Sequence, residues 1–373
     1  MLGNSRTTIR KARAVAVAGT AIALVTAVVP AASAVGAQPS QDLRIKPFSV
    51  RVPGKNAAGP RAAAAALAPL RTFNGSFSSG GTTFPYTMVG TAPTGAATTS
   101  TIPNSITPLA LRFGASTLGV PAANLTKVTT SGMYANKAFP GGTGQYGDVF
   151  MRTQFWTQLN GGAKNWHVKL AAPNVRPTLT LTVPAGSGRT LVLRGVTTGF
   201  ADVNWLDNAI QGYISAPAPT ILTQLLTNNI VLCDGAPLAD LSNCGIGGYH
   251  SLATNAAGRH TYSYQSYLNQ LIFQDPTFAN ISVMTHELAE WLADPYVNNR
   301  TPNWISAIAP QYGCNGFLEV GDPVVGRGMT IGGLFYQDEV YLSWFARQSP
   351  SQARLGRYTW FNSLTALSAA CVP

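Results

Sequence analysis

The stretch THELAEWLADP, residues 285–295, sets the expected fold and chemistry, because it places a histidine among three carboxylates at helical spacing. On an α-helix, His286 and Glu290 are four residues apart and lie on one face. Glu287 projects about 100° around the helix axis from His286. His286 and Glu290 could therefore bind one ion together, while Glu287 points in a different direction around the helix.

The surrounding residues predict a helix over 279–294. Leu288 and Leu292 occupy other faces and can pack inward. Asp294 continues the face of His286 and Glu290. Pro295 then ends the helix, because proline disfavours helical backbone in the residue before it.

The spacing resembles the H-E-x-x-H helix of zincin metallopeptidases, in which two metal ligands flank a glutamate that serves as general base. Glu290 stands where that pattern has its second histidine. A carboxylate binds zinc at about 2.0–2.2 Å, so a metal site is compatible with the change. A second carboxylate also favours harder ions such as Mn²⁺ or Ca²⁺. We expect one divalent ion, with Zn²⁺ the first candidate.

The acidic residues support cation binding. Of the 14 acids in the chain, seven lie between residues 287 and 339, among them all four glutamates. Glu319 follows Glu290 by 29 residues and is the expected third ligand. Asp294 and Asp322 are secondary candidates. A turn fixed by Asp322 and Pro323 would explain the second acidic segment without a metal.

The expected catalytic residues are Glu287 and His250. Glu287 would take a proton from a water on the metal as it attacks a peptide carbonyl. His250 follows a glycine-rich turn and would stabilise the oxyanion or fill a ligand position. The alternative is a capped amphipathic helix whose charges face water.

Several motifs together resemble a family of secreted bacterial proteins that are called metalloprotease-like because of this helix. They are HELAEWxxDPxxNN from residue 286, LEVGDP from residue 318 and YLSWF at 341–345, with GYHS at 248–251 and WHV at 166–168 as further landmarks. The resemblance covers roughly residues 145–371. It implies secretion and a metal site, and it indicates no substrate.

Composition excludes several classes of protein. Only 10% of the 373 residues are charged, which argues against coiled coils and long solvated helices. The net charge of +11 reflects scarce acids rather than clustered bases, so we expect no nucleic-acid partner.

The first 37 residues have the features of a secretory signal peptide: basic residues up to Arg13, an apolar run at 14–29, and small residues around Ala34. A membrane anchor is the alternative, but the run is shorter than the ~20 residues that a span needs. We expect a secreted or cell-envelope protein with no membrane anchor after cleavage.

Four cysteines in an exported chain predict two disulfides. Of the three possible pairings, we favour Cys233–Cys244 with Cys314–Cys371. A four-cysteine zinc site is the alternative, although no C-x2-C pair is present.

The whole chain is expected to be α+β. We assign residues 38–71 to a loosely packed linker or pro-segment, 72–145 to a β-rich region, and 146–373 to a zincin-like region that carries the metal site; the last two could form one domain. Further helices are predicted at 147–159, 202–214 and 338–347. Strands are predicted at 86–89, 106–113, 166–170, 178–183, 190–193, 229–233 and 261–267.

The remaining histidines and tryptophans have simpler interpretations. His167 is expected to be a hydrogen-bonded core or edge residue. The tyrosine-rich strand after His260 is expected to form a polar surface or, in a zincin, an edge that pairs with substrate. Trp291, Trp304 and Trp344, with Trp360, are expected in the core, with sugar binding as the alternative.

Three functions fit these features. The favoured one is a secreted metal-dependent hydrolase, a monomeric zinc metallopeptidase that acts on a peptide or protein. The second is a non-catalytic secreted or envelope protein with a structural metal site. The third is a carbohydrate- or surface-binding envelope protein. The adjacent base Glu287 favours the first, because a structural site needs ligands only.

Overall fold

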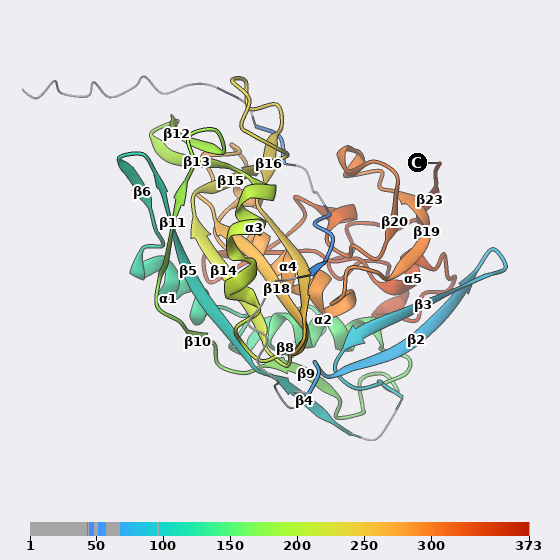
Figure 1. Ribbon diagram of the computed structural model, residues 1–373. Coiled ribbons are helices and arrows are strands. Elements are labelled where there is room, and N and C mark those ends of the chain that lie inside the picture. Colours follow the sequence, from blue (N-terminus) through green and yellow to red (C-terminus); the bar gives the residue numbers. More distant parts are fainter. Residues whose placement is uncertain (1–42, 44, 48–50, 57–67, 95–96, 373) are drawn as a thin grey trace, which may run out of the picture. The chain divides into compact units, whose positions relative to one another are not determined.

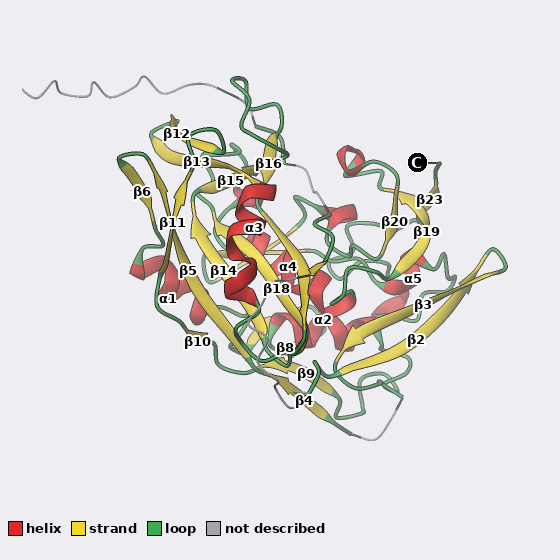
Figure 2. Ribbon diagram, viewed as in Figure 1, coloured by secondary structure: helices red, strands yellow, loops and turns green. Residues whose placement is uncertain are grey.

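The computed structural model describes residues 43, 45–47, 51–56, 68–94 and 97–372, and the structural statements below concern these residues. The expected signal peptide, residues 1–37, lies outside them. Strands predominate among the described residues (Figure 2), which confirms the α+β class. The α-helices are α1 (Ala122–Thr129), α2 (Tyr146–Gln154), α3 (Val203–Ile214), α4 (Ser282–Ala293) and α5 (Leu342–Phe345).

The largest sheet has eight strands, and Figure 1 shows how its central strands lie side by side. Its order is β1 (Lys55–Asn56), β17 (Gly248–Asn255), β18 (Gly258–Tyr267), β14 (Leu222–Asn228), β5 (Asn104–Phe113) and β10 (Asn174–Val175), and β6 (Ser116–Leu118) and β11 (Leu179–Val183) also pair with β5. Strands β18, β14 and β5 run parallel. Strand β17 is antiparallel to β18, and β1 is parallel to β17.

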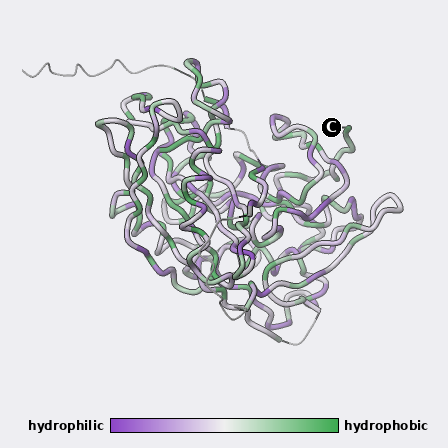
Figure 3. Tube along the Cα trace, viewed as in Figure 1, coloured by the Kyte–Doolittle hydropathy of each residue, from purple (hydrophilic) through white to green (hydrophobic). Residues whose placement is uncertain are grey.

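Two hydrophobic cores lie on the two faces of this sheet. Successive side chains of a strand point to opposite faces, so Leu225 joins the core that contains α3, and Leu226 joins the core that contains α2 and α4. Figure 3 shows the resulting short-range interleaving of hydrophobic and hydrophilic residues along the trace. On β17, Tyr249 belongs to the α3 core. His250 therefore faces α4.

Smaller sheets surround the large one. A four-stranded sheet contains β12 (Gly188–Leu193), β13 (Val196–Asp202), β15 (Ile230–Cys233) and β16 (Cys244–Ile246). A three-stranded sheet contains β20 (Asn315–Phe317), β19 (Arg300–Ile305) and β23 (Ala369–Ala370). The two-stranded sheets pair β2 (Thr72–Ser79) with β3 (Thr82–Val89), β4 (Thr99–Ile102) with β9 (His167–Leu170), β7 (Lys137–Phe139) with β8 (Gly142–Gly144), and β21 (Gly328–Ile331) with β22 (Leu334–Gln337).

The ranges expected as separate regions share structure. Strand β5 from residues 72–145 pairs with β14 from residues 146–373, so both ranges contribute to one sheet. The segment 38–71 was expected to pack loosely, and this is wrong for some of its described residues. Ile45 and Val52 are buried in two different cores, and β1 adds a strand to the sheet.

Three of the predicted helices correspond to α2, α3 and α4, but the helix predicted over 338–347 is wrong for its first half. Only Leu342–Phe345 is helical. Asp338 and Glu339 lie before this helix and are completely buried, so they are not the acidic first turn that a helix over 338–347 would give them. The Asp338 carboxylate instead accepts hydrogen bonds from the backbone N–H groups of Glu339 and Phe361.

The tyrosine-rich strand is also placed differently from either expectation. Strand β18 lies between β17 and β14, so it is neither a sheet edge nor a polar surface. Tyr262 and Tyr264 are fully buried beneath α3. Strand β17 is the next strand toward the sheet edge from β18, and β1 pairs with the outer side of β17.

Both favoured disulfides, Cys233–Cys244 and Cys314–Cys371, are formed. No free cysteine is left, which excludes the four-cysteine zinc site. The second bond joins residues that flank β20 and β23, the outer strands of the three-stranded sheet. It therefore holds the chain five residues before Glu319. Among the described helices, none is both long and apolar enough to cross a membrane.

Removing the Cys314–Cys371 bond by a double serine substitution is expected to lower the free energy of unfolding by ~4 kcal/mol, because the bond closes a loop of 57 residues. Urea unfolding of both proteins measures this. Removing Cys233–Cys244, which spans 11 residues, is the matched control and is expected to cost ~3 kcal/mol. Unchanged unfolding after loss of Cys314–Cys371 would contradict the role given to this bond.

Candidate metal centre

Helix α4 carries His286, Glu287 and Glu290, and it is buried on every face. The three residues are 8%, 4% and 4% exposed. Apolar neighbours such as Leu288 and Trp291 lie in the same core as α2. The alternative of a helix whose charges face water is therefore wrong. Buried ionisable groups need partners, because their desolvation is costly.

His286 is held from one side by a neighbouring loop and strand. Its Nδ1 lies 2.8 Å from Nε2 of Gln337, and that amide also donates to the carbonyl oxygen of Gly321. A Cβ on Gly321 would lie 2.5 Å from the His286 ring, so only glycine lets the loop pass so close. These contacts turn Nε2 of His286 toward Glu290, at 3.2 Å, and toward Asp322, at 3.5 Å.

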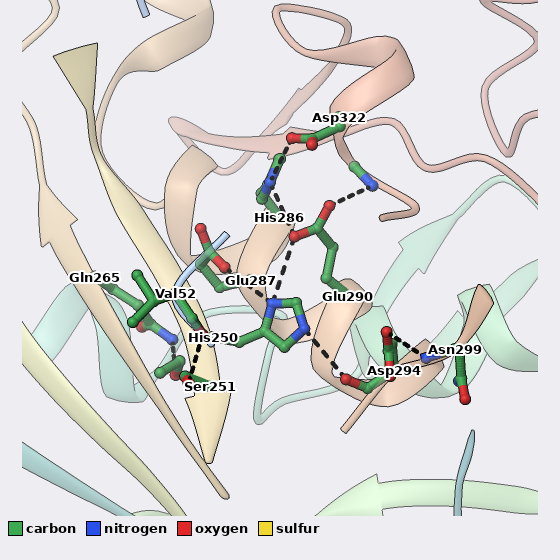
Figure 4. A network of polar contacts seen from close by, with 12 residues as sticks. Val52, His250, Ser251, Gln265, His286, Glu287, Glu290, Asp294, Asn299 and Asp322 are labelled. Atoms are coloured by element: carbon green, nitrogen blue, oxygen red, sulfur yellow. Dashed lines mark hydrogen bonds and ion pairs between the residues drawn. The ribbon is translucent and has the colours of Figure 1, made fainter. Parts of the chain in front are cut away.

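His250 reaches the same helix from β17 (Figure 4). Its Nε2 lies 3.2 Å from the backbone carbonyl oxygen of Asp294, which orients the ring. In the neutral imidazole, a hydrogen bond donated by Nε2 leaves the lone pair of Nδ1 available to a cation. Nδ1 lies 3.5 Å from Oε2 of both Glu287 and Glu290.

The ligand atoms form two groups that could each hold a cation: His286, Glu290 and Asp322 form one, and His250, Glu287 and Glu290 form the other. Glu290 belongs to both. Its Oε1 accepts a hydrogen bond from the N–H of Gly321, and its Oε2 faces both imidazoles. Glu290 is thus the central residue of the cluster.

The spacing within the groups suits a shared ion. A tetrahedral ion with ligands at about 2.0–2.2 Å sets neighbouring ligand atoms about 3.3–3.6 Å apart. The imidazole–carboxylate distances in the cluster are 3.2–3.5 Å. Direct charge-assisted hydrogen bonds would be shorter, at about 2.7–2.9 Å. The residues therefore fit a divalent ion.

The charge balance of the cluster points the same way. Burial raises the pKa of Glu287, and burial together with Glu290 raises the pKa of Glu319 well above its usual range. Burial alone would lower the pKa of His286 and His250, but the surrounding carboxylates outweigh it and raise both well above 6.5. This excess of negative charge is what a bound cation would neutralise.

Two of the acids proposed from the sequence lie outside both groups. The two carboxylate oxygens of Asp294 accept hydrogen bonds from the backbone N–H groups of Asn298 and Asn299, so Asp294 fixes the turn after α4. Glu319 is buried beside the cluster, and its Oε2 has no hydrogen-bond partner. The group with His286 and Glu290 therefore contains Asp322 rather than Glu319.

Two clefts meet at Glu287. The apolar cleft is lined mainly by hydrophobic side chains and reaches His286 and Glu287; it includes Phe273, Phe278, Val283, Tyr312 and Val325. The Arg51 cleft is lined by polar groups and includes Arg51, His250, Glu287, Glu290 and Glu319. Glu287 is therefore reached from two sides, and its buried Oε2 has no hydrogen-bond partner.

The remaining candidates are structural. Nδ1 of His167 lies 2.8 Å from the Asp148 carboxylate, as expected for a hydrogen-bonded histidine. His260 is buried, with Nε2 3.0 Å from Asn255. The four tryptophans are all at most 2% exposed, which excludes them as sugar-stacking surfaces; they are Trp291, Trp304, Trp344 and Trp360.

Sequence reasoning missed three residues of the centre. Gln337 orients His286, Gly321 allows close passage of its loop, and Arg51 lines one cleft. No local pattern marks Gln337 or Arg51, because each reaches the helix from a distant segment. Gly321 lies between Glu319 and Asp322. Its position in this acidic segment is the one feature of the sequence that could have identified any of the three residues.

The fold and cluster together define a strand-rich α+β protein with a buried histidine–carboxylate centre. Comparison of the chain with protein-family models, with curated proteins and with solved structures gives no match.

Proposed function

We propose that this protein is a secreted metal-dependent hydrolase of the metallopeptidase type, with a zincin-like arrangement around α4. His286, Glu290 and Asp322 would hold one divalent ion, with Zn²⁺ the first candidate and Mn²⁺ or Ca²⁺ the alternatives. The observation that supports catalysis most strongly is the position of Glu287, which adjoins this ligand group and lines both clefts. A purely structural site is normally closed by its ligands.

The bound ion would polarise the scissile carbonyl and lower the pKa of a water molecule. Glu287 would accept the proton of that water at Oε2 and pass it to the leaving amine. Burial raises the pKa of Glu287, which suits a group that must both take and release a proton near neutral pH. His250, 3.5 Å from Oε2 of Glu287, would orient that carboxylate and offset its charge.

A peptide substrate is supported by the apolar cleft. Phe273, Phe278 and Val283 form a hydrophobic wall next to Glu287. Such a wall suits an apolar side chain next to a scissile bond, because burying it away from water is favourable. Export is supported by the signal-like N-terminus and by the two disulfides, which persist in oxidising compartments.

Metal analysis of the purified mature protein tests the proposal. We expect about one divalent ion per chain, and hydrolysis of unfolded polypeptide that a chelator stops and added metal restores. Protein without bound metal, even after dialysis against Zn²⁺, Mn²⁺ and Ca²⁺, would contradict the proposal. A protein that binds metal but hydrolyses neither peptides nor glycans would instead have a structural metal site.

The third ligand can be identified by two matched substitutions. Asp322→Asn is expected to weaken metal affinity ~100-fold or more, because it removes a charge that lies 3.5 Å from Nε2 of His286. Glu319→Gln is expected to change metal affinity less than tenfold, because Glu319 is in neither ligand group. Metal titration with a competing chelator measures both. The reverse order of effects would assign the third ligand to Glu319.

A further inference from the structure

A short N-terminal segment, residues 51–56, lies on the outer side of β17 and is called the strap here. Its last two residues form β1, in which Lys55 pairs with Ala253 and Asn56 with Thr254, parallel to β17. His250 lies on the same strand, three residues before Ala253. The strap thus extends the sheet directly beside the candidate metal centre.

Contacts along its length hold the strap in place. The hydroxyl of Ser251 donates to the carbonyl oxygen of Val52, at 2.7 Å, and the Val52 side chain is buried in the core beneath α3 (Figure 4). Lys55 Nζ lies 2.7 Å from the carboxylate of Asp207 and donates to Asn208. Asp207 is fully buried and also accepts the hydroxyls of two tyrosines, Tyr249 and Tyr262, so it is a fixed anchor.

The other end of the strap reaches the carboxylates. The Arg51 guanidinium donates to the carbonyl oxygen of Val297 and lies 3.9 Å from the centre of the Phe317 ring. Arg51 lines the same cleft as His250, Glu287 and Glu319. Burial lowers the pKa of Arg51, and the nearby carboxylates of Glu319 and Asp294 offset part of that effect. Arg51 therefore places a positive charge at the cleft that leads to these carboxylates.

We propose that the strap occupies the binding position of an extended polypeptide and must leave before the centre accepts one. The inference rests on the proposed hydrolase function, whose substrate class and regulation it specifies. Pairing with β17 uses main-chain groups, which every polypeptide carries, so the same edge can accept other sequences. Arg51 and Lys55 add charged contacts near the two ends of the strap. The chain's own segment should therefore bind this edge more tightly than an unrelated sequence does.

The chain offers a place to separate the strap. Residues 62–66 are five consecutive alanines between the strap and the first strand of the β2–β3 hairpin. A recognition sequence for a specific protease inserted there would let the segment from residue 38 to the cut, which contains the strap, be separated from the rest of the purified mature chain. The nicked protein, which was folded with its strap in place, is then compared with the uncut one.

Binding is measured first, since it does not depend on hydrolysis. A fluorescent peptide of residues 45–56 is expected to bind the nicked protein after its own strap has been removed by size-exclusion chromatography, and to bind the uncut protein at least tenfold more weakly. A reduced, carboxymethylated protein used as an unfolded competitor should displace it. Equal binding to nicked and uncut protein, or no displacement, would overturn the proposal.

Activity is measured on the same samples. Hydrolysis of the unfolded protein is expected to rise about tenfold or more on nicking and to fall when the peptide is added back. If hydrolysis is absent in all samples while peptide binding and displacement occur as expected, the hydrolase proposal fails and the polypeptide site stands. If nicking and peptide addition leave a measurable activity unchanged, the strap does not regulate the centre.

Matched peptides test the anchors. Lys55→Ala in the labelled peptide is expected to weaken binding about tenfold, because it leaves the buried Asp207 without its cation. Lys46→Ala removes the same charge from an exposed residue outside the strap and is expected to leave binding within twofold. Equal effects of the two substitutions would show that binding is nonspecific attraction to a basic peptide.

Discussion

Replacing Glu290 with alanine is expected to reduce bound metal from about one ion per chain to less than a tenth of that, with loss of any hydrolysis. Glu290 is the residue common to both ligand groups. Its Oε2 lies within 3.5 Å of both imidazoles. No other carboxylate in either group can replace it, because each lies at one side of the cluster. Elemental analysis after dialysis against the chosen ion measures the loss.

The matched variant is Glu290→Gln, which separates charge from shape. The amide oxygen can still accept the hydrogen bond that Gly321 N–H donates to Oε1, so the loop should stay in place. Glutamine lacks the negative charge that binds the ion, so metal affinity should fall ~100-fold or more although the fold is kept. Circular dichroism and thermal unfolding check the fold. Full metal content in both variants would place the ion elsewhere.

Much of the α4 site could be predicted from the sequence because its information is local. The four-residue spacing of His286 and Glu290 requires only that the segment be helical. The concentration of glutamates also has a structural counterpart. Glu287, Glu290 and Glu319 lie in or beside the cluster. Burial raises the pKa of Glu339 well above its usual range, and the charge of His286 offsets part of that rise.

The residues that contact this helix could not be predicted from the sequence. The order of the strands and the path of a loop bring them to the helix from distant segments. His250 reaches α4 because it occupies the α4-facing side of β17, one residue from Tyr249 on the other face. A shift of one residue in register would have exchanged them. Similarly, Asp322 is three residues from Glu319, and only the path of the loop at Gly321 decides which of them faces His286.

The errors at Asp338, Glu339 and β18 share a cause. Charged residues at the start of an apolar run are typical of a helix N-terminus. A tyrosine- and serine-rich strand is typical of a half-exposed sheet. In this chain, partners from distant segments satisfy the buried polar groups: Phe361 donates to Asp338, and the Tyr146 hydroxyl lies 2.5 Å from Glu339. Local sequence does not carry such pairings.

Glu287→Gln is expected to lower the rate of peptide hydrolysis ~10²–10⁴-fold while bound metal stays at the wild-type level. The amide keeps the size of the side chain, but it cannot accept a proton. Glu287 adjoins the ligand group of His286, Glu290 and Asp322 without belonging to it. The loss should therefore fall on kcat, with KM changed little, because the group acts on the reacting atoms rather than on binding.

Glu339→Gln is the matched control, since Glu339 is also buried and its Oε1 lies within hydrogen-bond distance of a tyrosine hydroxyl, outside both ligand groups. It is expected to keep both metal and activity within a few-fold of wild type. The informative contrast is the metal content of the Glu287 variant. If Glu287→Gln loses the ion, Glu287 is a ligand, and the group of His250, Glu287 and Glu290 holds the metal. If it keeps both the ion and full activity, the proton acceptor is another residue, because an amide at this position cannot fill that role.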